Sequence, residues 1–318
     1  MTVSRVMKGT KGVGAATREK VLRIAEELNY TANPSARSLV TGKTGVIAII
    51  SGSMNQYYYS NIVHLLESQL TDSGYEMRLL NTRSDLKNLT SSTHATAVDG
   101  IIIAGRYHLA EGFRSLAPQA FQACVFIDAA KHPETDYVHA NLESAVEEAL
   151  NLMMKAGRSR IAYVGHFDQT PSLILPEDLL VLPEERMRTY LAVMEREGRP
   201  AELVRVSCSP FTPDSLKQYI EERGTPDAML CVNDETAMYV YRTLRNAGLR
   251  IPEDVLLVGC DGFPFMQCFD PPLSTILQPM EEMCALAWKF LQARITNPDL
   301  PLQQATFDAK LIVRSSLQ

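Results

Sequence analysis

The sequence predicts an α/β protein whose body has two lobes of parallel β-sheet flanked by helices, preceded by a small all-α amino-terminal arm. The length of 318 residues is long for one core and suits two lobes with an appendage. From residue 45 onward, short apolar runs alternate with amphipathic helical stretches. Residues 1–44 hold eight basic and three acidic side chains, whereas the rest of the chain holds 23 and 34. Because basic segments neutralise phosphates and release counterions, the arm indicates nucleic-acid binding; a solvated charged helix is the ordinary alternative.

In the arm, a helix is expected between residues 17 and 28, with Thr17 as its cap. Its apolar stripe has the spacing i, i+3, i+4, i+7 and consists of Val21, Ile24, Ala25 and Leu28. A short helix at 2–7 and a basic turn at 9–12 precede it. Segment 33–42 begins with a proline suited to a first helical turn and ends in a glycine. This last segment is too short to be stable alone, so it is expected to order on DNA.

In the body, eight strands are expected, and most end in Gly, Asp, Asn or Ser. The expected strands are 46–50, 76–80, 101–104, 125–127, 161–164, 203–206, 229–232 and 255–258. Ligands of open α/β sheets bind beyond the carboxyl ends of strands, so these polar strand ends are the expected site. Amphipathic helices are expected around 62–70 and 145–153, and an irregular surface insertion at 168–185.

Eight alternations exceed what one small sheet needs, so we expect the chain to pass between two lobes three times, near 140, 277 and 302. The first lobe is expected to contain 45–140 and 277–301, and the second lobe 141–276 and 302–318.

The composition narrows the class of protein. An apolar content of 46% is ordinary for a globular protein, and no apolar run approaches the length of a membrane span. The first residues show no export signal, so we expect a cytoplasmic protein without a membrane partner. The six cysteines form no C-x-x-C pair and are expected to be reduced structural thiols: Cys124, Cys208, Cys231, Cys260, Cys268 and Cys284.

Three motifs of the arm occur in a specific order: Thr-Val-Ser-Arg-Val at 2–6, Thr-Arg-Glu-Lys-Val at 17–21, and Leu-Asn-Tyr-x-x-Asn-Pro-x-Ala-Arg-x-Leu at 28–39. This combination resembles the helix-turn-helix domain of the LacI/GalR family of transcriptional repressors. The resemblance implies a recognition helix that enters the major groove, followed by a hinge helix whose leucine wedges into a minor-groove step. It implies DNA contacts by Thr2, Ser4, Arg5, Asn33, Ala36, Arg37 and Leu39.

The resemblance has one departure. Family members carry a first helix and turn ahead of the recognition helix, and this sequence begins at the recognition helix itself. Val3, Val6 and Met7 would then lack the helix against which they pack. We expect a start placed too late in the sequence, rather than a remnant with weakened DNA binding.

The body resembles the effector-binding core of the same family, which is built like periplasmic sugar-binding proteins. The match implies an effector site formed by Tyr58, Asp128, Arg186, Asn233 and Asp261. Arg186 matches an Arg-x-x-Gly-aromatic signature in which Thr189 replaces the glycine. Carboxylates, an amide and an arginine fork can bind vicinal hydroxyls, and a tyrosine can cover a sugar ring. The ordinary alternatives are helix caps for the aspartates, a surface position for the arginine and packing for the tyrosines 57–59, of which one or two would face the cleft.

Signals for catalysis are poor. Gly42-Lys43-Thr44 ends like a phosphate loop, but Arg37 stands where that loop needs glycine; no G-x-S-x-G occurs, and the histidines have no metal-ligand spacing. We therefore expect no enzyme, no cofactor and no metal. The resulting hypothesis is a homodimeric transcriptional regulator, a repressor, whose partners are operator DNA and a sugar-like effector, with nucleosides still possible. The alternatives are a periplasmic-type solute-binding protein and an α/β enzyme with a catalytic dyad in the cleft.

Overall fold

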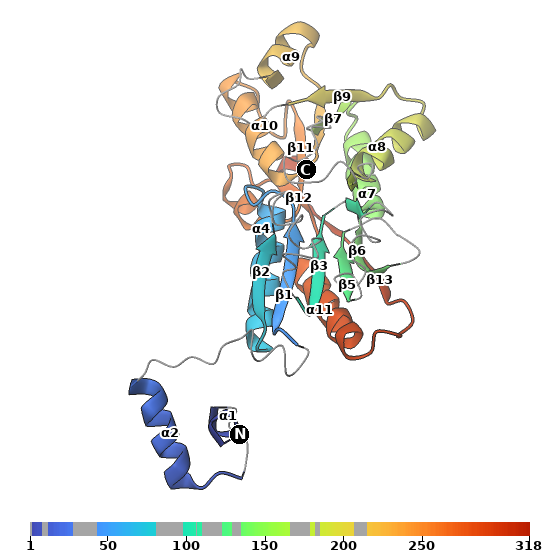
Figure 1. The fold of residues 1–318 in the computed structure, drawn as a ribbon. Coiled ribbons are helices and arrows are strands. Elements are labelled where there is room, and N and C mark those ends of the chain that lie inside the picture. The colour runs from blue at the N-terminus through green and yellow to red at the C-terminus, as the bar shows by residue number, and fades with distance from the viewer. Residues whose placement is uncertain are drawn as a thin grey trace.

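The computed structural model describes residues 2–7, 12–27, 43–80, 98–105, 107–109, 123–128, 135–165, 179–181, 185–206 and 215–318. Its body contains two six-stranded sheets with the strand orders β13-β6-β5-β3-β1-β2 and β14-β12-β11-β10-β7-β9 (Figure 1). The predicted α/β architecture of two mainly parallel, helix-flanked lobes is confirmed.

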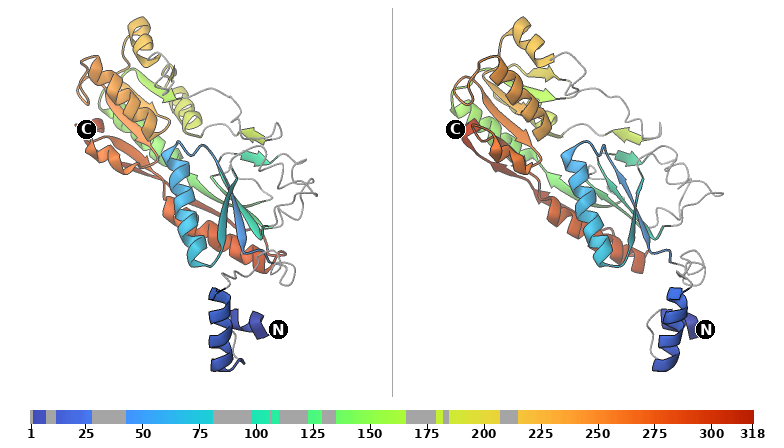
Figure 2. Two further views of the ribbon diagram at one scale, coloured as in Figure 1. Left: turned by 60° about the vertical axis from the view of Figure 1, so that its left-hand side comes forward. Right: turned by 90° about the vertical axis from the view of Figure 1, so that its left-hand side faces the viewer.

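The first sheet is parallel throughout, as expected for a sheet whose central strands are apolar and buried. Helices α4 (Tyr57–Asp72) and α11 (Met280–Thr296) lie side by side against it (Figure 2). The predicted stripe of α4 is buried there at Ile62, Leu66 and Leu70. The strands are β1 (Val46–Ser51), β2 (Glu76–Leu80), β3 (Gly100–Ala104), β5 (Cys124–Ile127), β6 (Asp136–Asn141) and β13 (Gln304–Asp308).

The second sheet is parallel except for β14, which runs antiparallel to β12. Alternate residues of its strands belong to different apolar clusters, one with helices α7 (Glu143–Lys155) and α8 (Glu185–Arg196), the other with α9 (Ser215–Arg223) and α10 (Asp234–Asn246). Successive strand side chains point to opposite faces, so these helix pairs cover the two faces of the sheet. The strands are β7 (Ile161–Gly165), β9 (Glu202–Arg205), β10 (Ala228–Cys231), β11 (Leu256–Cys260), β12 (Ser274–Leu277) and β14 (Lys310–Ile312).

Four smaller elements complete the described part of the body. Strands β4 (Tyr107–Leu109) and β8 (Leu179–Val181) form an antiparallel pair. The 3₁₀ helices η1 (Pro264–Cys268) and η2 (Ser315–Leu317) belong to the second lobe.

The chain passes between the sheets between β6 and α7, between β12 and α11, and at Ala309. The expected third crossing near residue 302 is wrong, because β13 pairs with β6 in the first sheet. Ala309 N donates to Asn141 O (3.0 Å), and Asn141 Nδ2 donates to Asp308 Oδ1 (2.9 Å). Two of the three crossings are therefore hydrogen-bonded to each other.

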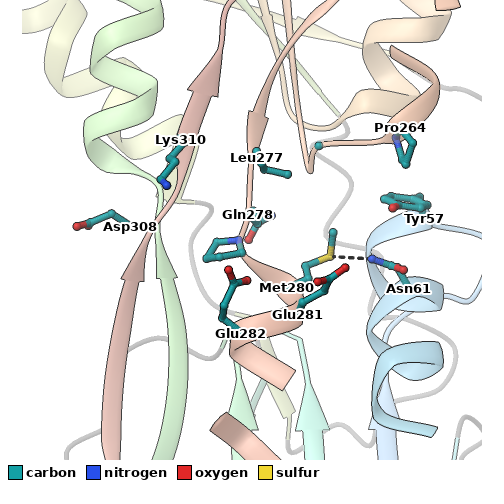
Figure 3. A pocket seen from close by; sticks show the side chains of 12 residues that line it. Tyr57, Asn61, Pro264, Leu277, Gln278, Met280, Glu281, Glu282, Asp308 and Lys310 are labelled. Atoms are coloured by element: carbon teal, nitrogen blue, oxygen red, sulfur yellow. Dashed lines mark hydrogen bonds between the residues drawn. The ribbon is translucent and has the colours of Figure 1, made fainter. Parts of the chain in front are cut away.

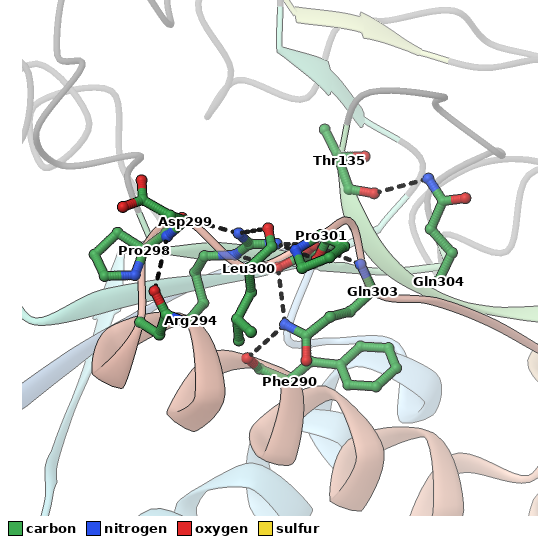
Figure 4. A network of polar contacts seen from close by, with 11 residues as sticks. Thr135, Phe290, Arg294, Pro298, Asp299, Leu300, Pro301, Gln303 and Gln304 are labelled. Atoms are coloured by element: carbon green, nitrogen blue, oxygen red, sulfur yellow. Dashed lines mark hydrogen bonds and ion pairs between the residues drawn. The ribbon is translucent and has the colours of Figure 1, made fainter.

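A buried ion pair closes the far end of the first lobe. Arg294 of α11 donates from Nε and Nη2 to both carboxylate oxygens of Asp136, at 2.9 and 2.8 Å. Its remaining donors reach the carbonyls of residues 298, 300 and 301, and Gln303 donates to Asp136 from its main chain and its side chain (Figure 4). The pair thereby joins α11, β6 and the turn that leads to β13.

The arm has two described helices, α1 (Thr2–Met7) and α2 (Ala15–Glu27), which contact each other. Helix α2 begins before Thr17, so the expected cap at that residue is wrong. No residue of α2 is buried: Val21 and Ala25 are half-buried, and Ile24 is 39% exposed. The predicted apolar stripe is thus only partly covered by the described residues, and Leu28 lies outside them.

Candidate functional site

The strand ends and helix starts of the two lobes meet around a cavity of about 110 Å³. All five residues expected to bind an effector line it, together with residues that the sequence did not single out. The lining consists of Gln56, Tyr58, Tyr59, Asp128, Arg186, Val232, Asn233, Asp261 and Gln278. The structure therefore brings the expected residues to one place, while their binding role stays a prediction.

Arg186 and Asp261 form a buried pair within the second lobe. Arg186 lies in the first turn of α8, and its Nη1 is 3.5 Å from Asp261 Oδ1. Gln278 Nε2 donates to the same oxygen at 2.8 Å. Burial raises the pKa of Asp261 to about 7, against the opposing effect of the Arg186 charge. Asp261 directly follows β11 and has a φ of 112°, a backbone conformation that is uncommon for residues other than glycine.

His139 connects the two lobes beside the cavity. Its Nδ1 lies 3.5 Å from Asp128 Oδ1 on the first lobe, and its Nε2 lies 3.3 Å from Glu185 Oε2 at the start of α8. Burial lowers the pKa of His139, but the contacts with Asp128 and Glu185 raise it to about 9. Only the imidazolium has a proton on both nitrogens, so the charged form alone satisfies both carboxylates.

The link through His139 predicts a pH-dependent stability. The folded pKa of about 9 lies above the ordinary value of 6.5, so the stabilisation is complete below about pH 6.5 and is lost as the pH rises through about 9. We expect His139→Gln to lower the free energy of urea unfolding most at pH 6, with the gap to wild type closing by pH 10. The exposed His64→Gln is the matched control. If the difference in unfolding free energy between His139→Gln and wild type were the same from pH 6 to pH 10, the charged form of His139 would not be the stabilising one.

Asn233 and Glu235 have structural partners. Asn233 Oδ1 caps α10 by accepting from Thr236 N at 2.9 Å, whereas the sequence had suggested helix caps only for the aspartates. Glu235 Oε1 accepts from Tyr57 N at 2.6 Å and so joins α10 of the second lobe to the start of α4 in the first. No sequence pattern predicts this contact, because the two residues are far apart in the chain.

The three consecutive tyrosines separate into two roles. Tyr58 and Tyr59 line the cavity, whereas the ring of Tyr57 packs at an angle of 54° against Phe263 of the second lobe, with ring centroids 4.4 Å apart. Gly52 is required beside them, because a Cβ at this position would come 2.4 Å from the Tyr59 ring.

Several buried polar atoms at the cavity have no hydrogen-bond partner among the described residues. They include the Tyr58 hydroxyl and Gln278 Oε1, on side chains that line the cavity, and Glu235 Oε2 next to it. Buried polar groups are normally paired, so unpaired atoms in a cavity indicate a place for a polar ligand.

A second, larger pocket of about 390 Å³ opens near the crossings (Figure 3). Glu281, Glu282, Asp308 and Lys310 line it, and all four side chains are exposed. Exposed charges are already satisfied by water, so the smaller cavity with its buried polar atoms is the better candidate despite its size.

Most of the residues expected to contact DNA lie outside the part of the chain that the structure describes. Thr2 is exposed on α1, as is its neighbour Val3. The side chains of Ser4 and Arg5 are not described, and Asn33, Ala36, Arg37 and Leu39 lie outside the described residues.

Two further features concern only the described ranges. There, no group of three His, Cys, Asp or Glu side chains is placed to hold a metal ion. None of the helices in these ranges combines the length and apolar surface that a bilayer-spanning helix needs.

Comparison with known proteins finds a family match for both the body and the amino-terminal arm of the chain. Residues 150–317 match the periplasmic binding protein-like domain, and residues 1–33 match the bacterial regulatory proteins of the lacI family. The repressor PurR of Photobacterium profundum is 26% identical, over 100% of this chain and 94% of that protein. The ribose operon repressor of Escherichia coli K12 is 28% identical, over 99% and 95%. CelR of Thermobifida fusca is 27% identical, over 99% and 94%.

Solved structures share the fold. The Lac repressor dimer bound to operator has a TM-score of 0.79 at 22% identity, covering 99% of this chain and 94% of that one. A LacI-family regulator from Silicibacter pomeroyi has a TM-score of 0.81 at 22% identity, covering 100% and 95%.

A two-lobed body that matches a periplasmic binding protein-like domain, together with an arm that matches a family of bacterial regulatory proteins, defines a transcriptional regulator. More than half of the chain matches the core domain, and the arm matches the family's DNA-binding segment. The chain belongs to the LacI family of bacterial regulatory proteins. A solute-binding protein without DNA function and an α/β enzyme are therefore not favoured.

Proposed function

We propose that this protein is a homodimeric repressor whose operator affinity is controlled by a small sugar or sugar derivative bound between its lobes. Residues 1–44 serve as the DNA-binding segment, and residues 45–318 as the effector-binding and dimerisation core. The supporting observation is the cleft cavity, which both lobes line and which contains buried polar atoms without partners.

The side chains around the cavity suit a polyol. Asp128 and Asp261 accept hydrogen bonds from hydroxyl groups, and Arg186 can bridge two neighbouring hydroxyl oxygens. Asn233 adds an amide, and the ring of Tyr58 covers an apolar sugar face. Structural neighbours support this class of ligand: CelR is known in a complex with cellobiose, and regulators from Enterococcus faecalis and Arthrobacter are known with ribose and lactose.

Effector binding would act through lobe closure. The cross-lobe bonds Glu235–Tyr57 and His139–Glu185 exist only when the lobes are close. A ligand that favours closure shifts the equilibrium between lobe arrangements and thereby the separation of the two DNA-binding segments in the dimer. We infer that the protein acts in the cytoplasm, where operator DNA is found, and that it works by binding rather than by catalysis.

The proposed function is tested by gel shifts at fixed salt. The probe is the DNA upstream of the protein's own gene, and ribose, cellobiose and lactose are added in turn. Specific binding that one sugar weakens or strengthens is the expected result. Binding that ignores sequence and every sugar would contradict the proposal.

Leu39→Ala is expected to reduce operator affinity by at least tenfold and to abolish DNA bending, because the side chain acts only when wedged between base steps. Circular-permutation gel shifts measure the bend. Urea unfolding and effector binding should match wild type, as they should for the exposed control Leu302→Ala. A Leu39→Ala protein that unfolds more easily would show that this leucine is part of a core instead.

A further inference from the structure

We propose that His139 is a positioning residue of the effector site, which as an imidazolium ties Asp128 of the first lobe to Glu185 of the second. This inference rests on the proposed function and adds a regulation of the same site, because closure of the lobes then takes up a proton. It is supported by the fixed place of His139 in the first lobe, by the fixed place of Glu185 in the second, and by the burial of the contact.

The first lobe holds Asp128 and His139 next to each other. His139 belongs to β6, and Asp128 directly follows the neighbouring strand β5. The main-chain N of Asp128 donates to the carbonyl oxygen of Val138, the residue before His139, at 2.8 Å. His139 Nδ1 lies 3.5 Å from Asp128 Oδ1 and makes no hydrogen bond to the described residues, so the two groups attract each other as charges. Since both belong to one lobe, this contact does not depend on closure.

Glu185 supplies the contact that does depend on closure. It is the first residue of α8, and its Oε2 lies 3.3 Å from His139 Nε2. Helix α8 is anchored to the second lobe by buried side chains such as Tyr190, whose hydroxyl donates to Ile161 O of β7 at 2.8 Å. Glu185 therefore moves with the second lobe, and its pair with His139 breaks when the lobes separate. The next residue, Arg186, lines the cavity, so a helix start held by His139 also places this cation.

Only a charged imidazole can attract both carboxylates. His139 is 7% exposed, and the side chains of Asp128 and Glu185 are 16% and 22% exposed, so water screens these contacts little. A neutral imidazole has one N–H, and its other nitrogen would turn a lone pair toward a carboxylate. Loss of the proton therefore removes the attraction across the cleft.

Among the described residues, the other charged groups on the elements around β6 have partners of their own or are exposed. Burial lowers the pKa of His139, and the facing carboxylates of Asp128 and Glu185 raise it to about 9. The paired groups around them are Arg294 with Asp136, Asp308 with Asn141, Arg196 with Glu147, and Arg186 with Asp261.

Closure and protonation are thereby coupled. In the closed arrangement the pKa of His139 is about 9, and separation from Glu185 removes one of the two charges that raise it. On opening, the pKa therefore falls toward its ordinary value of 6.5. Between these two values closing takes up a proton. The closed form, and any effector that requires it, is favoured at the lower pH and loses this advantage as the pH rises through about 9.

The first experiment needs no effector. NMR of the full chain with isotope-labelled histidine follows each imidazole through its titration, and the His139 signal is the one that His139→Gln lacks. The expected midpoint is near pH 9 in wild type. In Glu185→Gln, which keeps the side-chain shape and removes the charge, the midpoint should be lower by about one pH unit or more. Glu195→Gln, an exposed position on the same helix, is the matched control and should leave the midpoint unchanged.

The second experiment connects this proton to the effector. Calorimetry with ribose, cellobiose and lactose is carried out between pH 8 and pH 10, above the pKa of about 7 of Asp261. The affinity of wild type is expected to fall by about twofold to tenfold across this range. His139→Gln should bind with the lower affinity at both ends, whereas the exposed His64→Gln should follow wild type.

The outcomes distinguish the inference from the proposed function. A wild-type midpoint near pH 6.5, or one that Glu185→Gln leaves in place, would overturn the inference whatever binds in the cleft. So would a sugar affinity that is constant from pH 8 to pH 10 in wild type, or that falls equally in His139→Gln. If no sugar binds while the titration follows expectation, the proposed effector class is refuted and the proton-dependent tie between the lobes is supported.

Discussion

Arg294→Met should lower the free energy of unfolding by about 3–5 kcal/mol, because it leaves the Asp136 carboxylate buried without its cation. The side chains of both residues are less than a tenth exposed, so water cannot replace the lost donors. The turn to β13 also loses the bonds that Arg294 gives to three carbonyl groups. Urea unfolding followed by circular dichroism measures the change.

Two further variants make this result specific. Arg196→Met removes an exposed arginine with two ion-pair partners and should change stability little. Arg294→Met combined with Asp136→Asn should recover part of the loss, since no buried charge then remains. If Arg294→Met and Arg196→Met lowered the free energy of unfolding equally, burial of the Arg294–Asp136 pair would not be the reason for its effect.

Arg186→Ala should weaken effector binding by one to two orders of magnitude, because a hydrogen bond to a charged group contributes about 1.5–3 kcal/mol. Asp261→Ala should have an effect of similar size. Calorimetry with whichever of ribose, cellobiose and lactose binds most tightly measures both. Dimer stability should change less, because Asp261, with a pKa near 7, can take up a proton when its arginine partner is removed.

Arg188→Ala provides the matched control for the cleft. It lies two residues further along the same helix, but its side chain is exposed. It should bind the effector like wild type. If Arg186→Ala also binds normally, Arg186 and Asp261 form a structural pair and the effector site lies elsewhere.

The sequence predicted the fold well wherever strands were uniformly apolar. Strands β1, β3 and β7 are buried at every position, and their apolar runs were clear. Strand β6 was not predicted, because its sequence Asp-Tyr-Val-His-Ala-Asn mixes charged and apolar residues. Asp136 and His139 are buried there only because Arg294, Asp128 and Glu185, which belong to other elements, supply their partners.

The edge strand β13 and the contacts between the lobes could not be predicted from the sequence either, because they also depend on residues of other elements. Strand β13 alternates exposed and half-buried residues and has one neighbour, so its pattern is weak and the third crossing was misplaced. The expected cavity residues followed from strand ends and from family resemblance. Gln278 and His139 were missed, because their roles depend on which side chains the opposite lobe or a neighbouring strand presents.

The connection of β13 to β14 through Ala309 also determines when the protein can finish folding during its synthesis. These strands complete the outer edges of the two different sheets, and both come from the last segment of the chain. Helix α11, which packs against the first sheet, is made only shortly before them. Neither lobe can therefore mature on the ribosome ahead of the other, although the first lobe begins the body. A stop codon at residue 304 would leave two unfinished sheets rather than one intact lobe and one damaged one.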